Sequence, residues 1–229
     1  DETQAEVVIS DTVATPIKEI PVEDTAYLSF MEDIPPFDFS TMEIEQHEGC
    51  TDSLVYPGGA SGPTISCGLD LGNAGLKTVT AVLEYSVPDS IYNILIQATK
   101  VRGENSPSWI RRNQVHLGAK TATKICNRLK VYIWRLLTSK YPNLHDAPGP
   151  VKTAMLDIAF QAGVGSKRMY GFGRVIARKD WNTLGQMIEV SYSDFEGGKY
   201  HSIHRRRENH GKQIQFLYNP PEKYVIDYD

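Results

Sequence analysis

Apolar side chains recur with a helical period through most of the chain after residue 73. Leu76, Val79, Thr80 and Leu83 fall on one face of a helix that Pro88 ends. The same period, interrupted by proline and glycine, predicts later helices over about 89–102, a short piece after 106, and 122–141, 151–162, 165–178, 181–191 and 200–217.

A different pattern occupies residues 40–72, ahead of the helical part. Ser40 and Glu43 have the spacing of a helix capping box, and Glu48 is followed by the glycine that commonly ends a helix. Apolar residues at 54–56, a glycine-rich turn at 57–62 and a second short run at 64–67 predict a β-hairpin. One hairpin within a helical body predicts an α+β fold in which helices dominate.

Residues 1–39 mix acids, threonine and proline without a sustained period, and we expect an acidic N-terminal arm or linker there. They carry ten acidic side chains and one lysine, a net charge of −9 against −4 for the whole chain, which leaves +5 on the remainder. A mildly basic body suits an anionic polymer such as a cell wall or nucleic acid, although an ordinary solvated surface has the same balance. We divide the chain into an arm at 1–39, a globular domain at 40–218 and a C-terminal tail at 219–229.

No apolar run approaches the length needed to cross a bilayer, and the first residues lack the features of a signal peptide, so we expect neither. The chain has three cysteines, Cys50, Cys67 and Cys126, too few for a disulfide framework. Cys50 and Cys67 flank the hairpin and would staple it in an oxidising compartment. The alternative is a set of buried thiols, a common use of cysteine in protein cores.

Two carboxylates and a hydroxyl are expected to meet at the hairpin. The turn folds Thr64 and Asp70 back toward the predicted helix end that carries Glu48. The helix dipole disfavours a carboxylate at that end, which indicates a functional role for Glu48. Asp70 also has the position of an N-cap for the following helix, and one residue can serve both roles. Two carboxyl groups at a cleft are the parts that glycoside hydrolysis needs.

These residues also resemble a known family. Glu48-Gly49, a tyrosine-ended strand, the glycine-rich turn and Thr64-Ile65 resemble the active-site segment of phage-type lysozymes. The run S-G-P-T-I-S-C-G-L-D-L-G at 61–72 is closer still to the pesticin-like muramidases, whose pattern S-G-x-T-I-x-x-G-x-D-L-G places the second acid six residues after the threonine. The main phage-type family carries that acid within the hairpin, where Pro57, Gly58 and Gly59 stand here.

Later segments agree with the family in order. Residues 157–163 resemble the buried helix that ends in F-Q-x-G, 174–181 resemble the next helix and the tryptophan after it, and 205–208 resemble the arginine-rich start of the final helix. The resemblance covers about 40–218. It implies a lysozyme-like fold with a small β-hairpin subdomain at the active-site cleft.

The family's activity implies a peptidoglycan hydrolase, a lysozyme or muramidase that cleaves the β-1,4 bond between N-acetylmuramic acid and N-acetylglucosamine without a cofactor. Glu48 would be the general acid, while Asp70 and Thr64 would hold the attacking water, with inversion at the anomeric carbon. Gln161 would bond the sugar chain or position the acid; the alternative is a partner within the protein. Tyr56 would line the cleft or only pack. Asp52 is a weaker substitute for Asp70.

The three histidines His201, His204 and His210 invite a metal interpretation, but no acid or cysteine completes a set, and the arginines at 205–207 would repel a dication. We expect no metal there and no nucleic-acid partner, and a solvated face is the default.

The expected partner is bacterial peptidoglycan, reached by secretion or by delivery to the periplasm or cell wall, as for a phage lysin or an effector. The arm would bind a delivery receptor, an immunity partner or nothing. Three rival functions stay open: a lytic transglycosylase with a single acid, a wall-binding module that has lost catalysis, and a cysteine-histidine peptidase on Cys67.

Overall fold

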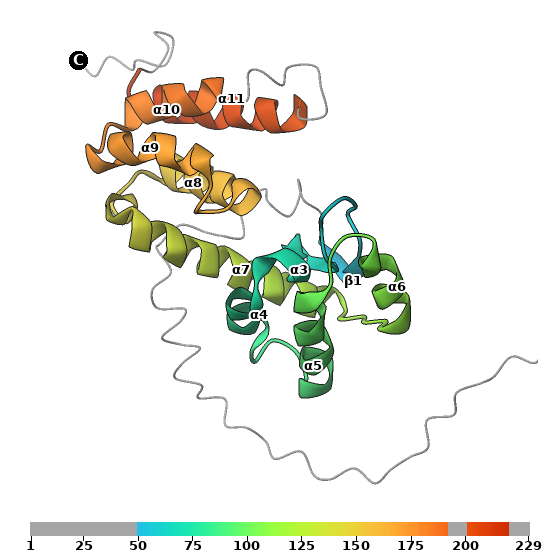
Figure 1. The fold of residues 1–229 in the computed structure, drawn as a ribbon. Helices are drawn as coiled ribbons and strands as arrows, with labels where there is room; N and C mark the ends of the chain where they lie inside the picture. Colours follow the sequence, from blue (N-terminus) through green and yellow to red (C-terminus); the bar gives the residue numbers. More distant parts are fainter. Residues whose placement is uncertain (1–49, 192–200, 220–229) are drawn as a thin grey trace, which may run out of the picture. The chain divides into compact units, whose positions relative to one another are not determined.

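The computed structural model describes residues 50–191 and 201–219, for His201 the backbone only. Figure 1 shows these residues as a small sheet and a series of helices. The arm predicted at 1–39, the helix predicted at 40–48 and nearly all of the predicted tail lie outside this part of the chain.

The predicted hairpin is present and belongs to a three-stranded antiparallel sheet. Its strands are β1 (Thr51–Val55), β2 (Thr64–Ser66) and β3 (Leu69–Asp70), in the order β1-β2-β3. The sequence did not predict β3, because two residues are too few to show an alternation. The turn into β3 is tight: Ser66 and Gly68 both have positive φ, 59° and 99°, a region that glycine enters without steric cost.

The helical pattern after residue 73 is confirmed, with small shifts at the ends. The helices are α3 (Leu71–Ala74), α4 (Leu76–Leu83), α5 (Asp89–Gln97), η2 (Ala98–Lys100), α6 (Asn105–Arg112), α7 (Ala119–Lys140), η3 (Pro142–Leu144), α8 (Gly149–Ala162), α9 (Lys167–Ala177), α10 (Trp181–Val190) and α11 (His201–Phe216). One predicted face is wrong in part. Leu76 is 57% exposed, and Val82 is buried beside Val79 and Leu83 instead.

A hydrophobic cluster joins the sheet to α4, α5 and the first half of α7. Its buried members include Ile65 and Leu69 from the sheet and Leu71 from the start of α3, and Phe160 of α8 packs against it. The hairpin therefore contributes to the core and does not stand apart from the helices. Across the described residues, no helix has the length and apolar character that a membrane span requires.

A disulfide ties the end of β2 to α7. It joins Cys67 to Cys126, both fully buried and 59 residues apart, while Cys50 is an exposed free thiol. The predicted Cys50–Cys67 staple is therefore wrong, and so is the alternative of three buried thiols. The physical reason is that α7 packs over β2 and brings the two Cα atoms to 5.4 Å, within the range that a disulfide spans.

Helices α10 and α11 lie side by side, as Figure 1 shows. Their backbones meet at Gly185 and Gly211: a Cβ on Gly211 would lie 2.6 Å from the carbonyl oxygen of Gly185. Because α11 also contacts α8, the pair brings α11 side chains onto the predicted F-Q-x-G helix.

Candidate active site

Asp70 ends β3 and begins α3, and its carboxylate is held by three N–H groups. Oδ1 accepts hydrogen bonds from the backbone N–H of Gly62 at 2.9 Å and of Asn73 at 3.0 Å, and Oδ2 accepts one from the Asn73 side chain at 2.8 Å. The expected N-cap role is present, since the Asn73 contact caps α3. Both oxygens act as acceptors, as an ionised carboxylate requires.

Thr64 lies directly opposite Asp70 in the β2–β3 ladder. Paired residues of an antiparallel ladder direct their side chains to the same face. The Thr64 side chain is buried and its hydroxyl donates to the carbonyl oxygen of Gly62 at 3.1 Å. Thr64 and Asp70 thus bind the two backbone groups of one residue: the N–H of Gly62 donates to Asp70, and the carbonyl oxygen of Gly62 accepts from Thr64.

Two glycines of the 61–72 motif allow a close approach of three backbone segments at this point. A Cβ on Gly62 would lie 2.6 Å from Cα of Gly72, and one on Gly72 would lie 2.3 Å from the carbonyl oxygen of Val101. Arg102 reinforces the contact, because its Nε donates to the carbonyl oxygen of Gly72 at 2.7 Å. The segment at 101–103 therefore supports the turn that carries Asp70.

Tyr56 follows β1 and secures its own turn. Its hydroxyl donates to the carbonyl oxygen of Gly59 at 2.7 Å, and the residue is half-buried. Gly58 and Gly59 in that turn have φ of 104° and 62°, which explains the glycine pair where the main phage-type family carries an acid.

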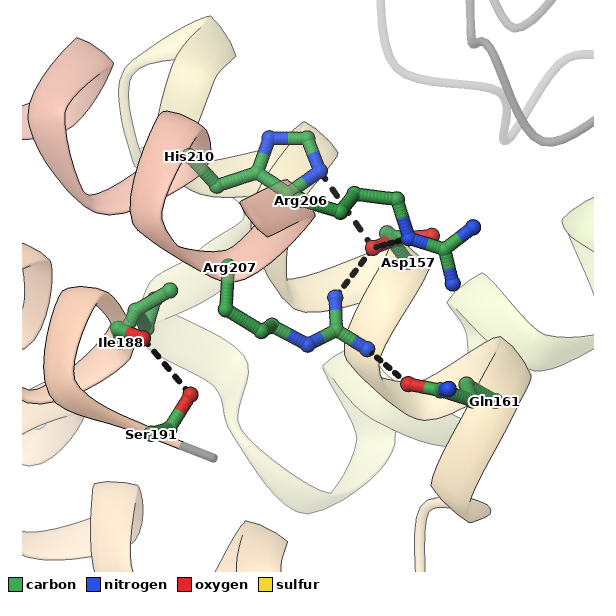
Figure 2. A network of polar contacts seen from close by, with 7 residues as sticks. All are labelled: Asp157, Gln161, Ile188, Ser191, Arg206, Arg207 and His210. Carbon is green, nitrogen blue, oxygen red and sulfur yellow. Dashed lines mark hydrogen bonds and ion pairs between the residues drawn. The ribbon is translucent and has the colours of Figure 1, made fainter. Parts of the chain in front are cut away.

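Gln161 lies in the last turn of α8 and contacts α11 (Figure 2). Its Oε1 accepts a hydrogen bond from Nη2 of Arg207, and Nη1 of the same guanidinium binds Asp157. Asp157 lies one helical turn before Gln161 and is buried. The predicted alternative of a partner within the protein is therefore present for Gln161.

Three basic side chains from α11 surround the Asp157 carboxylate. Oδ2 is contacted by Arg207, by Nε of Arg206 at 3.2 Å and by Nε2 of His210 at 3.3 Å. Burial acts to raise the pKa of Asp157, but the hydrogen bond from His210 and the charges of Arg207 and Arg206 outweigh it and leave this pKa lowered. The carboxylate is thus a buried anion whose charge is compensated by its neighbours.

A protein-family model agrees with these features. The model described as "Pesticin: Bacterial toxin homologue of phage lysozyme, C-term" matches residues 48–182. The chain belongs to this family. The match begins at Glu48 and includes Thr64, Asp70 and Gln161, while α11 lies beyond it. No curated protein matches the chain.

The lysozyme-like fold of the pesticin family is thus shown for this chain. The described residues include all of the predicted site residues except one. Glu48, the predicted general acid, lies outside the described residues. The predicted substitute Asp52 is engaged elsewhere, with Ser53 at 3.1 Å and with Nδ1 of His116 at 3.5 Å.

Among the described residues, no group of three or more His, Cys, Asp or Glu side chains is placed to hold a metal ion. His210 is bound to Asp157 instead, and His201 is described only in its backbone. Sequence reasoning missed two supporting groups, Arg102 and the Asp157–Arg207 pair. Arg102 gave no signal, whereas a lone aspartate inside the apolar run 151–162 pointed to a buried partner, since a buried charge requires compensation.

Proposed function

We propose that this chain is a muramidase, a glycoside hydrolase that cleaves the β-1,4 bond between N-acetylmuramic acid and N-acetylglucosamine in peptidoglycan. The observation that carries the proposal is the pairing of Thr64 with Asp70 across β2 and β3, anchored on Gly62, within a domain of the pesticin family.

In the proposed mechanism the hairpin holds the attacking water. An ionised carboxylate offers about four lone-pair sites, and N–H groups fill three of those of Asp70. The remaining site accepts a proton of the water, and the Thr64 hydroxyl, whose own proton goes to Gly62, offers a second acceptor. Asp70 then takes the proton of the water as general base while the water attacks the anomeric carbon.

Glu48 is the proposed general acid, which gives its proton to the leaving glycosidic oxygen. A water between the two carboxyl groups requires them to stand about 6.5–9.5 Å apart, and the reaction then inverts the anomeric configuration. Gln161 and Tyr56 are proposed to line the glycan site. The reaction needs no cofactor, because the two carboxyl groups supply the acid and the base.

The proposed domain spans residues 40–218, preceded by the arm at 1–39 and followed by the tail at 219–229. Its proposed place of action is the bacterial cell wall or periplasm, reached by secretion or delivery, with peptidoglycan as partner. The acidic arm is proposed to contact a delivery or immunity partner.

The test compares the wild-type chain with Glu48→Gln on purified peptidoglycan. The variant keeps the shape of the side chain and removes the proton donor, so we expect lysis to be lost while the circular dichroism spectrum is unchanged. Lysis retained by Glu48→Gln would exclude the assignment. Binding of the wall by wild type without soluble fragments would indicate a module that has lost catalysis.

Product analysis separates hydrolysis from the transglycosylase alternative. Hydrolysis adds one water to each cleaved bond, whereas a transglycosylase leaves an anhydro-sugar that is lighter by one water. Proton NMR of the first-formed product tests the stereochemistry: inversion of a β-linked chain gives the α-anomer first. Asp70→Asn should lower the hydrolysis rate by about 10²–10⁴-fold if Asp70 is the general base.

A further inference from the structure

The contact between Arg207 and Gln161 determines which end of the Gln161 amide faces the interior. Arg207 is fully buried, whereas Gln161 is half-buried in the last turn of α8. Figure 2 shows the amide oxygen of Gln161 directed at the guanidinium and the amide nitrogen on the side away from it.

This orientation follows from chemistry, because an arginine has five N–H donors and no acceptor. The Gln161 side chain can meet Arg207 only through Oε1, and a flipped amide would place two donors against a cation. The guanidinium itself cannot turn freely, since its Nη1 is bound to the buried carboxylate of Asp157.

The position of Gln161 also relates it to the hairpin. The preceding residue, Phe160, packs against the hydrophobic cluster that contains Ile65 and Leu69, and its ring lies 4.0 Å from where a Cβ of Gly68 would be. Gln161 therefore follows directly on the residue of α8 that reaches the sheet carrying Thr64 and Asp70.

We propose that Asp157 and Arg207 are positioning residues, which fix the Gln161 amide so that Nε2 donates a hydrogen bond to an acetamido carbonyl oxygen of the bound glycan. This inference rests on the proposed muramidase function and deepens it, by naming the atom of Gln161 that binds and the group of the sugar it recognises. The acetamido carbonyl is the strongest uncharged acceptor on an N-acetylated sugar, which fits a donor whose polarity the protein has fixed.

Two substitutions at Gln161 separate the donor from the acceptor. Gln161→Glu keeps an oxygen for Arg207 and removes the donor, whereas Gln161→Met removes both. If Nε2 binds the glycan, both variants raise KM on solubilised peptidoglycan about tenfold, the effect of one lost hydrogen bond, with a smaller change in kcat. A KM for Gln161→Glu within twofold of wild type would overturn the proposal.

The positioning role is tested with Arg207→Met and a double variant. Because Arg207 acts through Gln161, Arg207→Met should raise KM about as much as Gln161→Met, and Arg207→Met/Gln161→Met should raise it no further. The control is Lys179→Met, which removes an exposed cation whose partner is Asp146 and not Asp157. It should leave KM unchanged; additive effects of Arg207→Met and Gln161→Met would overturn the positioning role.

A binding measurement on the wild-type chain does not depend on whether any variant folds. The side-chain N–H signals of Gln161, assigned by triple-resonance spectroscopy of the ¹³C,¹⁵N-labelled wild-type protein, are followed during titration with chitotetraose and with cellotetraose. The first sugar carries acetamido groups and the second carries hydroxyls in their place, so we expect the Gln161 signals to shift with chitotetraose alone.

Equal shifts with both sugars, or chitotetraose binding that leaves the Gln161 signals in place, would overturn the proposal. Failure of the muramidase assignment is a separate outcome, because it appears as absence of wall lysis in the wild-type chain, whatever the Gln161 variants do.

Discussion

The turn around Asp70 and the end of α8 fix their polar side chains by opposite means. Around Asp70 the partners are mostly main-chain groups close in sequence: Asp70 reaches Gly62, eight residues away, and Thr64 reaches the same residue, two away. At the end of α8 the partners are side chains about 50 residues away, since Asp157 and Gln161 both bind Arg207.

The difference concerns what each region needs in order to form. The turn needs a local chain path, which glycines at 62 and 72 provide, and the Asp70 carboxylate in it is held by uncharged N–H groups. The Asp157 network needs α11 docked on α8, and its contacts join full charges that are buried together. A local turn is therefore sensitive to shape, whereas the docked network is sensitive to charge.

The largest expected effect comes from cutting the tie between the hairpin and α7. Removing the Cys67–Cys126 disulfide, as Cys67→Ala/Cys126→Ala, releases a 59-residue link and should lower the free energy of unfolding by about 4 kcal/mol. Urea denaturation measures it. Cys50→Ala is the matched control and should have no effect, because Cys50 is exposed and free. Equal stability of the double variant and wild type would show that the hairpin needs no tie.

The second-largest loss of unfolding free energy is expected when the charge of Asp157 is removed from the docked network. Asp157→Asn leaves Arg206, Arg207 and His210 around an uncharged amide, so we expect a loss of about 3 kcal/mol, near the lower end for one partner of a buried ion pair. Asp146→Asn is the control, because Asp146 forms an exposed pair with Lys179 that contributes at most about 1 kcal/mol. If both variants lost the same free energy of unfolding, the buried pair of Asp157 would contribute no more to stability than the exposed pair of Asp146.

The contribution of the Asp157 network to the free energy of unfolding should depend on pH. The pKa of Asp157 is lowered in the folded chain, so its contribution to stability is present above its unfolded pKa of about 4 and is lost as pH falls through the lower folded value. Urea denaturation from pH 7 to pH 2.5 should therefore show a smaller acid loss in Asp157→Asn than in wild type. Parallel pH profiles of the two proteins would contradict this expectation.

In the turn around Asp70, a side chain added at a close backbone contact should lower the free energy of unfolding. Gly72→Ala puts a Cβ 2.3 Å from the carbonyl oxygen of Val101, and we expect a loss of about 2 kcal/mol from overpacking, with lower activity as the Asp70 turn shifts. The control is Gly171→Ala, where a Cβ meets nothing within 4 Å inside α9. That control should be neutral or slightly stabilising, since alanine favours helix.

The smallest effect is expected from one donor to Asp70. Asn73→Ala removes the side-chain hydrogen bonds to Oδ2 and to the carbonyl oxygen of Ala60 but keeps the backbone N–H on Oδ1, so we expect a loss of about 1 kcal/mol. Activity should fall only slightly, because Gly62 still holds the carboxylate. Peptidoglycan turnover and urea denaturation measure the two effects, and a loss of activity as large as that of Asp70→Asn would show that Asn73 has a further role.

Much of the fold could be predicted because its signals are local. The apolar period after residue 73, the glycine-rich turn and the caps each depend on neighbours within a few residues, and the structure has the corresponding elements. The hairpin turn that was expected to bring Thr64 and Asp70 together is also a local signal, although their pairing across β2 and β3 was not predicted. The third strand was not predicted because it has only two residues. Leu76 was predicted on the buried face of its helix but is exposed.

The sequence by itself determined the helical body, the hairpin, the family and the close approach of Thr64 and Asp70, because each depends on short-range geometry or on a contiguous motif. Only the tertiary structure decided that Cys67 pairs with Cys126 and that Arg207 meets both Asp157 and Gln161. Those partners are separated by 46 to 59 residues, and no local pattern specifies which of several cysteines or arginines the packing of α7 and α11 will bring into contact.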